Sequence, residues 1–211
     1  MRYEEFTIEG RNAVIEAYRA GRPIDKLFIL DGCQDGPILT IKREAKAKQT
    51  PVKFVTKERL DQLSETGKHQ GVIAYAAAYE YATVEEILDN ARQKGEAPFL
   101  FLLDNIEDPH NLGAIIRTAN LAGAHGVIVP KNRAAGLTAV VAKTSAGALN
   151  FTPVARVTNL AKTIEELKKE GIWFVCADMG GTTMYDLNLK GPIGLVTVSY
   201  THLRAHETGA Y

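Results

Sequence analysis

The chain has 211 residues, of which 25 are Lys or Arg and 25 are Asp or Glu, so its formal net charge is zero. This balance argues against a histone-like or tail-type nucleic-acid binder, but it leaves a local basic patch open because a summed charge says nothing about its distribution. An apolar fraction of 45% is enough for a substantial core, and the length suits one large domain or two small ones.

The cysteines and the hydropathy indicate the compartment. Cys33 and Cys176 lie far apart and match no metal-binding or redox spacing. Because Cys176 stands in the apolar run IWFVCA, we expect a buried free thiol in a reducing environment. The N-terminal MRYEEFTIEG lacks the apolar core of a signal peptide, and no stretch approaches the roughly 20 apolar residues that span a bilayer. We therefore expect a cytoplasmic protein without a membrane segment.

In the first half of the chain, short apolar runs alternate with helical patterns. The expected elements are, in order, a helix at 10–20, a strand at 26–30 (KLFIL), a helix at 37–49, a strand at 52–55, a helix at 57–65 and a strand at 71–77. This alternation favours a parallel or mixed sheet with helices packed on it.

A junction follows at AYEYAT (78–83), and we place a domain boundary near residue 80. The helix at 83–95 begins with Thr83 as its cap and Glu86 three residues on. The elements expected after it are strands at 99–103, 126–130, 152–157, 172–177 and 191–196 and helices at 111–123, 138–148 and 158–170. We expect this second domain to hold the chemistry.

The segment DNIEDPHNLGAIIRTANLAGAHGVIVP (104–130) joins a strand to a helix, which is where α/β proteins often bind nucleotides. Its turn carries Asp, Pro, His and Asn in place of a glycine fingerprint. Asn111 stands where we expect the helix cap, and Gly113 lets the backbone of the first turn approach a neighbour closely. Arg117 falls off the apolar stripe, which is formed by Leu112, Ile115, Ile116 and Ala119.

Two interpretations of this turn stay open at this point. In the first, Asp108 or Asn111 is only a cap, Pro109 a turn former and Arg117 a solvated charge. In the second, the helix N-terminus, the Asn111 amide and the Arg117 guanidinium converge on a phosphate-bearing substrate.

Two other polar features have alternatives of their own. We expect a structural role for His69, because a single histidine without a partner rarely means chemistry. The basic side chains of the second helix form either a phosphate patch or, as we favour, a solvated face; they are Lys42, Arg43, Lys46 and Lys48.

The segment DNIEDPHNLGAIIRTANLAGAHGVI resembles the first motif of the SpoU (TrmH-type) family of RNA ribose 2′-O-methyltransferases, part of the SPOUT superfamily. Other segments resemble the same family in the same order and spacing: GRNAVIEA (10–17), HQGVIA (69–74), KTSAGALNFTPVARVTNL (143–160) and GPIGLV (191–196). The subgroup most similar to the chain methylates a guanosine ribose in 23S rRNA.

This resemblance implies an α/β protein with two domains. Residues 1–78 would form a small L30e-like α/β domain that binds the RNA substrate, and residues 79–196 an α/β-knot (SPOUT) methyltransferase domain. The cofactor would be S-adenosyl-L-methionine, the partner RNA, most specifically 23S rRNA, and the full-length form a homodimer, with no metal required.

The resemblance also implies a catalytic pair, Asn111 and Arg117. Arg117 would contact a phosphate, assist loss of the hydroxyl proton and stabilise the developing alkoxide, and Asn111 would orient Arg117 or the ribose. Since guanidinium groups stay protonated in proteins, the phosphate and oxyanion roles are physically easier for Arg117 than that of a base.

Residues 197–211, TVSYTHLRAHETGAY, depart from the family. Val198 occupies a family glycine position and Tyr200 a glutamate position, and a later Ser-Leu-Asn motif is absent. In the family these segments complete the knot and line the cofactor pocket, so we expect an incomplete knot and an inactive chain. A foreign or frame-shifted sequence joined after Val196 and a natural truncation both explain the departure.

Two alternatives to a methyltransferase differ in class. The departure after Val196 favours a non-catalytic RNA-binding protein, while Asn111 and Arg117 favour descent from an active enzyme. A nucleotide-dependent oxidoreductase is disfavoured, because no predicted strand is followed by a G-x-G-x-x-G turn.

Overall fold

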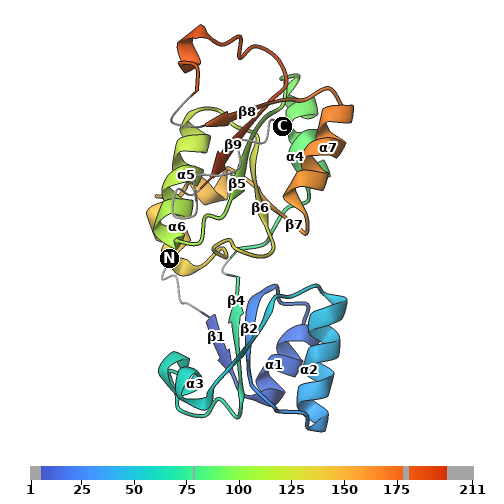
Figure 1. Ribbon diagram of the computed structural model, residues 1–211, viewed down its shortest axis with the longest axis vertical. Helices are drawn as coiled ribbons and strands as arrows, with labels where there is room; N and C mark the ends of the chain where they lie inside the picture. The colour runs from blue at the N-terminus through green and yellow to red at the C-terminus, as the bar shows by residue number, and fades with distance from the viewer. Residues whose placement is uncertain (1–5, 78, 178–180, 199–211) are drawn as a thin grey trace.

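The computed structural model describes residues 6–77, 79–177 and 181–198, which build two separate sheets, each with its own helices (Figure 1). The chain passes from the first sheet to the second between residues 76 and 99. The predicted departure of the tail, and with it the incomplete knot, falls mostly on residues 199–211, outside the described residues.

The first sheet is mixed, as its alternating elements predict. Its strands lie in the order β1 (Phe6–Glu9), β4 (Val72–Ala76), β2 (Ile24–Leu30) and β3 (Val52–Val55). β4 runs antiparallel to β1 and β2, and β3 runs parallel to β2. Strand β1 was not predicted, because its four residues form a strand only by pairing with the distant β4.

Helices α1 (Arg11–Arg19) and α2 (Gly36–Ala47) pack side by side on one face of this sheet (Figure 1). In β2, Leu27 and Ile29 are buried against them, as period-two alternation requires. The short helix α3 (Lys57–Leu63) contacts β2 and β4. The first domain thus has a core of its own.

The second sheet is wholly parallel. Its strands lie in the order β7 (Val154–Val157), β6 (Gly126–Pro130), β5 (Phe99–Asp104), β9 (Ile193–Val198) and β8 (Trp173–Ala177). The five strands expected in this half are therefore confirmed, with β5 at the centre.

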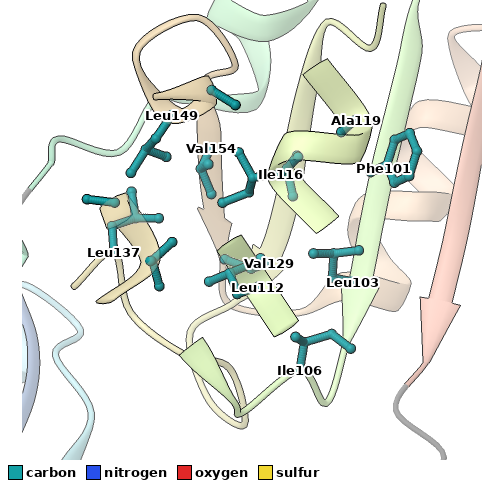
Figure 2. Packing of buried hydrophobic residues seen from close by; sticks show 14 residues of the cluster. Phe101, Leu103, Ile106, Leu112, Ile116, Ala119, Val129, Leu137, Leu149 and Val154 are labelled. Carbon is teal, nitrogen blue, oxygen red and sulfur yellow. The ribbon is translucent and has the colours of Figure 1, made fainter. Parts of the chain in front are cut away.

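Helices cover both faces of the second sheet, as a parallel sheet requires. In Figure 1, α4 (Val84–Lys94) and α7 (Leu160–Lys169) lie on one side, and α5 (Pro109–Leu121) and α6 (Ala139–Thr144) on the other. Leu100 and Leu102 of β5 are buried toward the first pair, and Phe101 and Leu103 toward the second (Figure 2). Two short 3-10 turns, η1 (Ala148–Asn150) and η2 (Met184–Asp186), complete the described elements.

The predicted cap of α4 is confirmed. The Glu86 backbone N–H donates to the Thr83 hydroxyl at 3.1 Å, and the Thr83 N–H donates to the Glu86 carboxylate at 2.6 Å. This reciprocal capping box closes the helix start, and Gly95 closes its end in the left-handed conformation.

The expectation of a buried Cys176 is wrong, since this side chain is exposed. Its strand, β8, lies at the edge of the sheet, and Trp173 at the start of β8 is 77% exposed. An apolar run predicts burial only where the strand is covered, and the place of β8 at the edge comes from pairing with a segment of distant sequence.

Candidate active site

The segment singled out by sequence, the turn after β5, lies at the carboxyl edge of the parallel sheet. β5 ends at the exposed Asp104, whose register partner is Val198 at the end of β9. Parallel α/β sheets bind their ligands beyond this edge. The turn of residues 105–108 and the end of β9 therefore border the same site.

The turn is held firmly on its inner side. Asn105 adopts a left-handed backbone conformation (φ 59°), and the Glu107 N–H donates to the Asn105 carbonyl at 3.1 Å. Ile106 is buried below the end of β5 (Figure 2), and its carbonyl accepts from the Ala135 N–H at 2.8 Å. The turn is thus fixed to the loop of residues 131–138 that leads into α6.

The cap of α5 is Asp108, so the expectation that Asn111 is the cap is wrong. The Asp108 carboxylate accepts from the His110 N–H at 2.9 Å, and Pro109 is the first helical residue. Because proline needs no hydrogen-bond partner for its nitrogen and its φ suits a helix, the Asp-Pro pair places the cap three residues before Asn111 and the first helical residue two residues before it. Asn111 lies inside the first turn, with its side chain exposed.

The predicted faces of α5 are confirmed in the main. Leu112, Ile116 and Ala119 are fully buried and point into the core (Figure 2), while Ile115 is only half-buried. Arg117 is exposed, and in the described part of the chain it makes no hydrogen bond or ion pair. The guanidinium is therefore available to a ligand.

Asn111 and Arg117 do not meet in this structure. Six residues of α-helix separate them by about 9 Å along the axis and by about 120° around it. Within the described ranges no hydrogen bond joins the two side chains. Asn111 thus does not orient Arg117 by direct contact, and the two can cooperate only through a ligand that reaches both. His110, seven residues before Arg117 and exposed, lies on the same side of the helix as Arg117.

The predicted close approach at Gly113 is made by α6. A Cβ atom at Gly113 would overlap the Thr144 hydroxyl and would lie 2.9 Å from the Val141 carbonyl oxygen. Thr144 in turn donates its hydroxyl to the Val140 carbonyl at 2.8 Å. Gly113 therefore sets the contact between α5 and α6 rather than contacting a ligand.

The charges around the turn are divided between its edge and its outer flank. Asp104, Glu107 and Asp108 are exposed carboxylates at the carboxyl edge, whereas the outer flank of α5 carries Arg117. Lys26 of β2 lies close enough to Glu107 to interact with its charge. Burial and the charge of Lys53 lower the pKa of Lys26, and the charge of Glu107 opposes that shift. The first domain thus brings a cation beside the turn.

His69 has the structural role that its sequence context favours. It is buried, its Nε2 lies 2.9 Å from Asp61 Oδ1, and its Nδ1 accepts from the Gly71 N–H at 3.0 Å.

Among the residues that the structure describes, no group of three or more His, Cys, Asp or Glu side chains is arranged to hold a metal ion. No described helix is long and apolar enough to span a bilayer.

Two family models match the chain, one over each sheet. The SpoU rRNA methylase family matches residues 98–197, and the substrate-binding domain of RNA 2′-O ribose methyltransferases matches residues 7–82. A protein of Bacillus subtilis (strain 168) named as a TrmH family tRNA/rRNA methyltransferase is 48% identical over 189 residues, which cover 90% of this chain and 75% of the relative. The chain belongs to the SpoU (TrmH) family of RNA methyltransferases.

Other members agree in sequence and in fold. A TrmH family protein from Staphylococcus epidermidis is 44% identical over 194 residues, covering 92% of this chain and 78% of that protein. The crystal structure of the SpoU methyltransferase AviRb from Streptomyces viridochromogenes, solved in complex with AdoMet, matches with a TM-score of 0.51 at 21% identity. That match covers 93% of this chain and 74% of AviRb, and it confirms the predicted fold class.

Proposed function

We propose that the function of this SpoU-family protein is to transfer the methyl group of S-adenosyl-L-methionine to a ribose 2′-hydroxyl of RNA, at a guanosine of 23S rRNA, and that the chain with residues 198–211 as they stand is inactive. The observation that carries the proposal is the exposed Arg117, without a partner in the described chain, on the helix that begins at the carboxyl edge of the sheet. The substrate-binding model over residues 7–82 supports RNA as the substrate and the ribose as the target.

The reaction is an in-line displacement, in which the ribose oxygen forms a bond to carbon as the sulfur–carbon bond breaks and the hydroxyl proton leaves. S-adenosyl-L-methionine supplies the electrophilic methyl group on its sulfonium. Arg117 binds the adjoining RNA phosphate and stabilises the oxyanion that develops on the ribose. Asn111, on another side of the helix, holds the ribose through its amide.

The carboxyl edge fits a sulfonium cofactor in its charge. Asp104, Glu107 and Asp108 present three exposed carboxylates there, and Arg117 lies nine residues beyond Asp108, on the outer flank. A positive sulfonium is favoured beside the carboxylates of the carboxyl edge, and a phosphate is favoured beside Arg117 on the outer flank. This division would set the sulfonium sulfur and the ribose oxygen on opposite sides of the methyl carbon, as an in-line displacement requires.

The remaining expectations are part of this proposal. Residues 1–78 would bind RNA and residues 79–196 carry out the transfer, in a cytoplasmic protein that acts as a homodimer. The family model ends at residue 197, next to the position where Val198 replaces the family glycine. We expect this departure to weaken cofactor binding. For the chain as it stands, the valine at position 198 therefore favours a second candidate function, RNA binding without catalysis.

The test compares two proteins. One is the 211-residue chain, and the other is a graft in which residues 198–211 are replaced by the corresponding C-terminal segment of the Bacillus subtilis relative. We expect the graft to transfer labelled methyl groups to protein-free RNA and the original chain to transfer none. Transfer by the original chain at the rate of the graft would contradict the expectation for the tail, and no transfer by a folded graft that binds RNA would contradict the enzymatic proposal.

A further inference from the structure

A cavity of about 260 Å³ lies between the two sheets, away from the α5 turn. Its walls come from the turn after α1, the turn after α2, the segment before α4 and the ends of β6 and β7. Four of its lining side chains are cationic: Arg22, Lys48, Lys131 and Arg156. Lys48 is one of the basic side chains of the second helix for which the sequence favours a solvated face over a phosphate patch.

The floor of the cavity is a hydrogen-bonded network that joins the two domains. Arg156 donates to the Asp25 carboxylate at 2.8 Å, to the Asp25 carbonyl at 2.9 Å and to the Lys131 carbonyl at 3.0 Å. The Tyr81 hydroxyl donates to the same carboxylate at 2.6 Å and accepts from the Leu137 N–H at 3.1 Å. These bonds hold the Arg156 guanidinium in place against the ring of Tyr81.

The positive charge of the cavity is only partly compensated. Asp25 is committed to Arg156, and Lys131 bonds to the neutral side-chain oxygen of Gln49, which also accepts from the Thr158 hydroxyl at 3.0 Å. Burial lowers the pKa of Lys131, and the neighbouring charge of Arg156 lowers it further. Neither Lys48 nor Lys131 forms an ion pair with any residue of the described ranges. An anion in this cavity would therefore be stabilised by the charges of Lys48 and Lys131, which form no ion pair within the described ranges.

A buried tyrosine also lines this cavity. Tyr18 is 6% exposed and lines the cavity, and its hydroxyl makes no hydrogen bond of normal geometry with any described residue, although Thr50 lies near it. A buried polar group without a partner costs about 1–3 kcal/mol. A ligand with an acceptor oxygen would satisfy this hydroxyl.

The cavity and the active-site turn are connected through two segments. Asp25 meets Arg156 at the cavity, while the next residue, Lys26, is influenced by Glu107 in the turn. The loop of residues 131–138 begins at Lys131 of the cavity and bonds through Ala135 to Ile106.

We infer that this junction cavity binds a phosphate group of the RNA substrate, with Arg22, Lys48 and Lys131 around the phosphate and the Tyr18 hydroxyl donating to one of its oxygens. The inference rests on the proposed function, of which it names a second contact with RNA. The volume lies below the roughly 300–1,000 Å³ of a pocket for a drug-sized ligand, and it suits a phosphate with its sugar. Phosphate contacts of this kind position RNA without reading its sequence.

The test measures RNA affinity by filter binding, with labelled fragments of protein-free 23S rRNA and the full chain. The variant Arg22→Gln/Lys48→Gln removes two charges from the cavity, and Arg19→Gln/Lys46→Gln removes two exposed charges from the last turns of α1 and α2, outside the cavity. We expect the first to weaken binding about tenfold or more and to reduce the slope of log K against log salt by about 0.7, as the loss of one phosphate contact requires, and the second to change affinity less than about twofold. Equal weakening by both variants would overturn the inference.

A second variant, Tyr18→Phe, keeps the ring and removes only the unsatisfied hydroxyl. We expect weaker RNA binding together with unchanged or increased thermal stability, whereas a purely structural Tyr18 would leave RNA affinity unchanged.

Guanosine 5′-monophosphate serves as the free-nucleotide probe. If the cavity variants lose binding of this nucleotide but keep full RNA affinity, the cavity is a free-nucleotide site and its assignment to RNA is overturned.

The design separates this inference from the proposed function. A wild-type chain that binds no RNA would overturn both. If the folded Arg22→Gln/Lys48→Gln and Tyr18→Phe variants bind RNA as tightly as the wild-type chain does, only the assignment of the cavity to RNA is overturned.

Discussion

Gly113 shows at the scale of one residue how the packing of α5 is set. The first turn of this helix lies so close to α6 that a single added carbon would overlap Thr144. The sequence indicates the close approach, because a glycine inside a helix needs a reason. The partner could not be predicted, since α6 is about 30 residues further along the chain and only the fold brings it there.

We predict that Gly113→Ala lowers the free energy of unfolding by about 1–3 kcal/mol, because α5 and α6 must move apart. The matched control is Ala114→Ser, which also adds one heavy atom but on the exposed side of the same turn, and it should change stability by less than about 0.5 kcal/mol. Urea denaturation followed by circular dichroism measures both. Equal stability of the two variants would mean that this contact is looser than the structure has it.

Arg117 is predicted to act on the reaction and not on the fold. In the graft protein, Arg117→Ala should reduce methyl transfer by at least about 100-fold, the loss typical of removing an oxyanion-stabilising group. Because the side chain is exposed and has no partner in the described chain, the melting temperature and the affinity for S-adenosyl-L-methionine should be unchanged. Arg43→Ala, an exposed arginine on α2, is the control. Full transfer by Arg117→Ala would remove this residue from the site.

The candidate pair shows where residue-level prediction ends. The exposure of Arg117 follows from helical spacing, because the apolar stripe of α5 fixes which side faces the core. The cap assignment of Asn111 failed because two cap-forming residues, Asp108 and Asn111, stand three positions apart. The proline between them decides in favour of Asp108. The missing contact between Asn111 and Arg117 follows from the six helical residues that separate them.

At the scale of elements, the link between β1 and the loop after α3 depends on one carboxylate. Glu9 accepts hydrogen bonds from the Ser64 and Thr66 hydroxyls, both at 2.6 Å, and from the Glu65 and Thr66 N–H groups at 2.6 and 3.3 Å. Burial alone would raise the pKa of Glu9, but these bonds outweigh it and lower the pKa to about 2. The ionised carboxylate thus ties the loop to the edge of the first sheet.

The stability contributed by Glu9 should therefore depend on pH. Since its pKa is lower in the folded than in the unfolded chain, the contribution is complete above about pH 5 and is lost as the pH falls toward 2. We predict that Glu9→Gln costs about 1–2 kcal/mol at pH 7, after allowance for solvent screening, and progressively less at pH 4 and 3. Urea titrations at these pH values, with the exposed Glu16→Gln as control, measure it. A cost that is independent of pH would contradict the assignment.

The elements themselves were largely predictable. Alternation of apolar runs with helical stripes, and local signals such as Thr83 with Glu86, depend on neighbouring residues and are visible in sequence. Strand β1 and the exposure of β8 depend on which strand pairs with which. That information is spread over the whole chain, so these two features could not be predicted from local patterns.

At the scale of the whole molecule, the two sheets are joined by the Asp25–Arg156 pair, in which the side chains are 6% and 12% exposed. Burial raises the pKa of Asp25, and the charge of Arg156 and the bond from Tyr81 oppose that shift. Arg156→Ala should destabilise the protein by about 3 kcal/mol, because it leaves a buried carboxylate without its cation. The control Arg92→Ala, in an exposed group of ion pairs, should cost less than about 1 kcal/mol. Equal costs in urea denaturation would contradict a stabilising junction.

A net charge of zero did not reveal the cationic cavity at this junction, because its members come from five separate parts of the chain. The family resemblance predicted the order of the domains and the kind of chemistry. Their mutual contacts depend on the side chains that meet at the junction, and neither composition nor periodicity carries that information.

The most direct test of the central claim is the identity of the methylated nucleoside. The graft protein is incubated with methyl-deuterated S-adenosyl-L-methionine and unmodified 23S rRNA and tRNA, and the digested RNA is analysed by mass spectrometry. We predict labelled 2′-O-methylguanosine from the 23S rRNA, and none from the Arg117→Ala protein. Label on a base, or no label from a folded graft that binds both RNA and cofactor, would contradict the account.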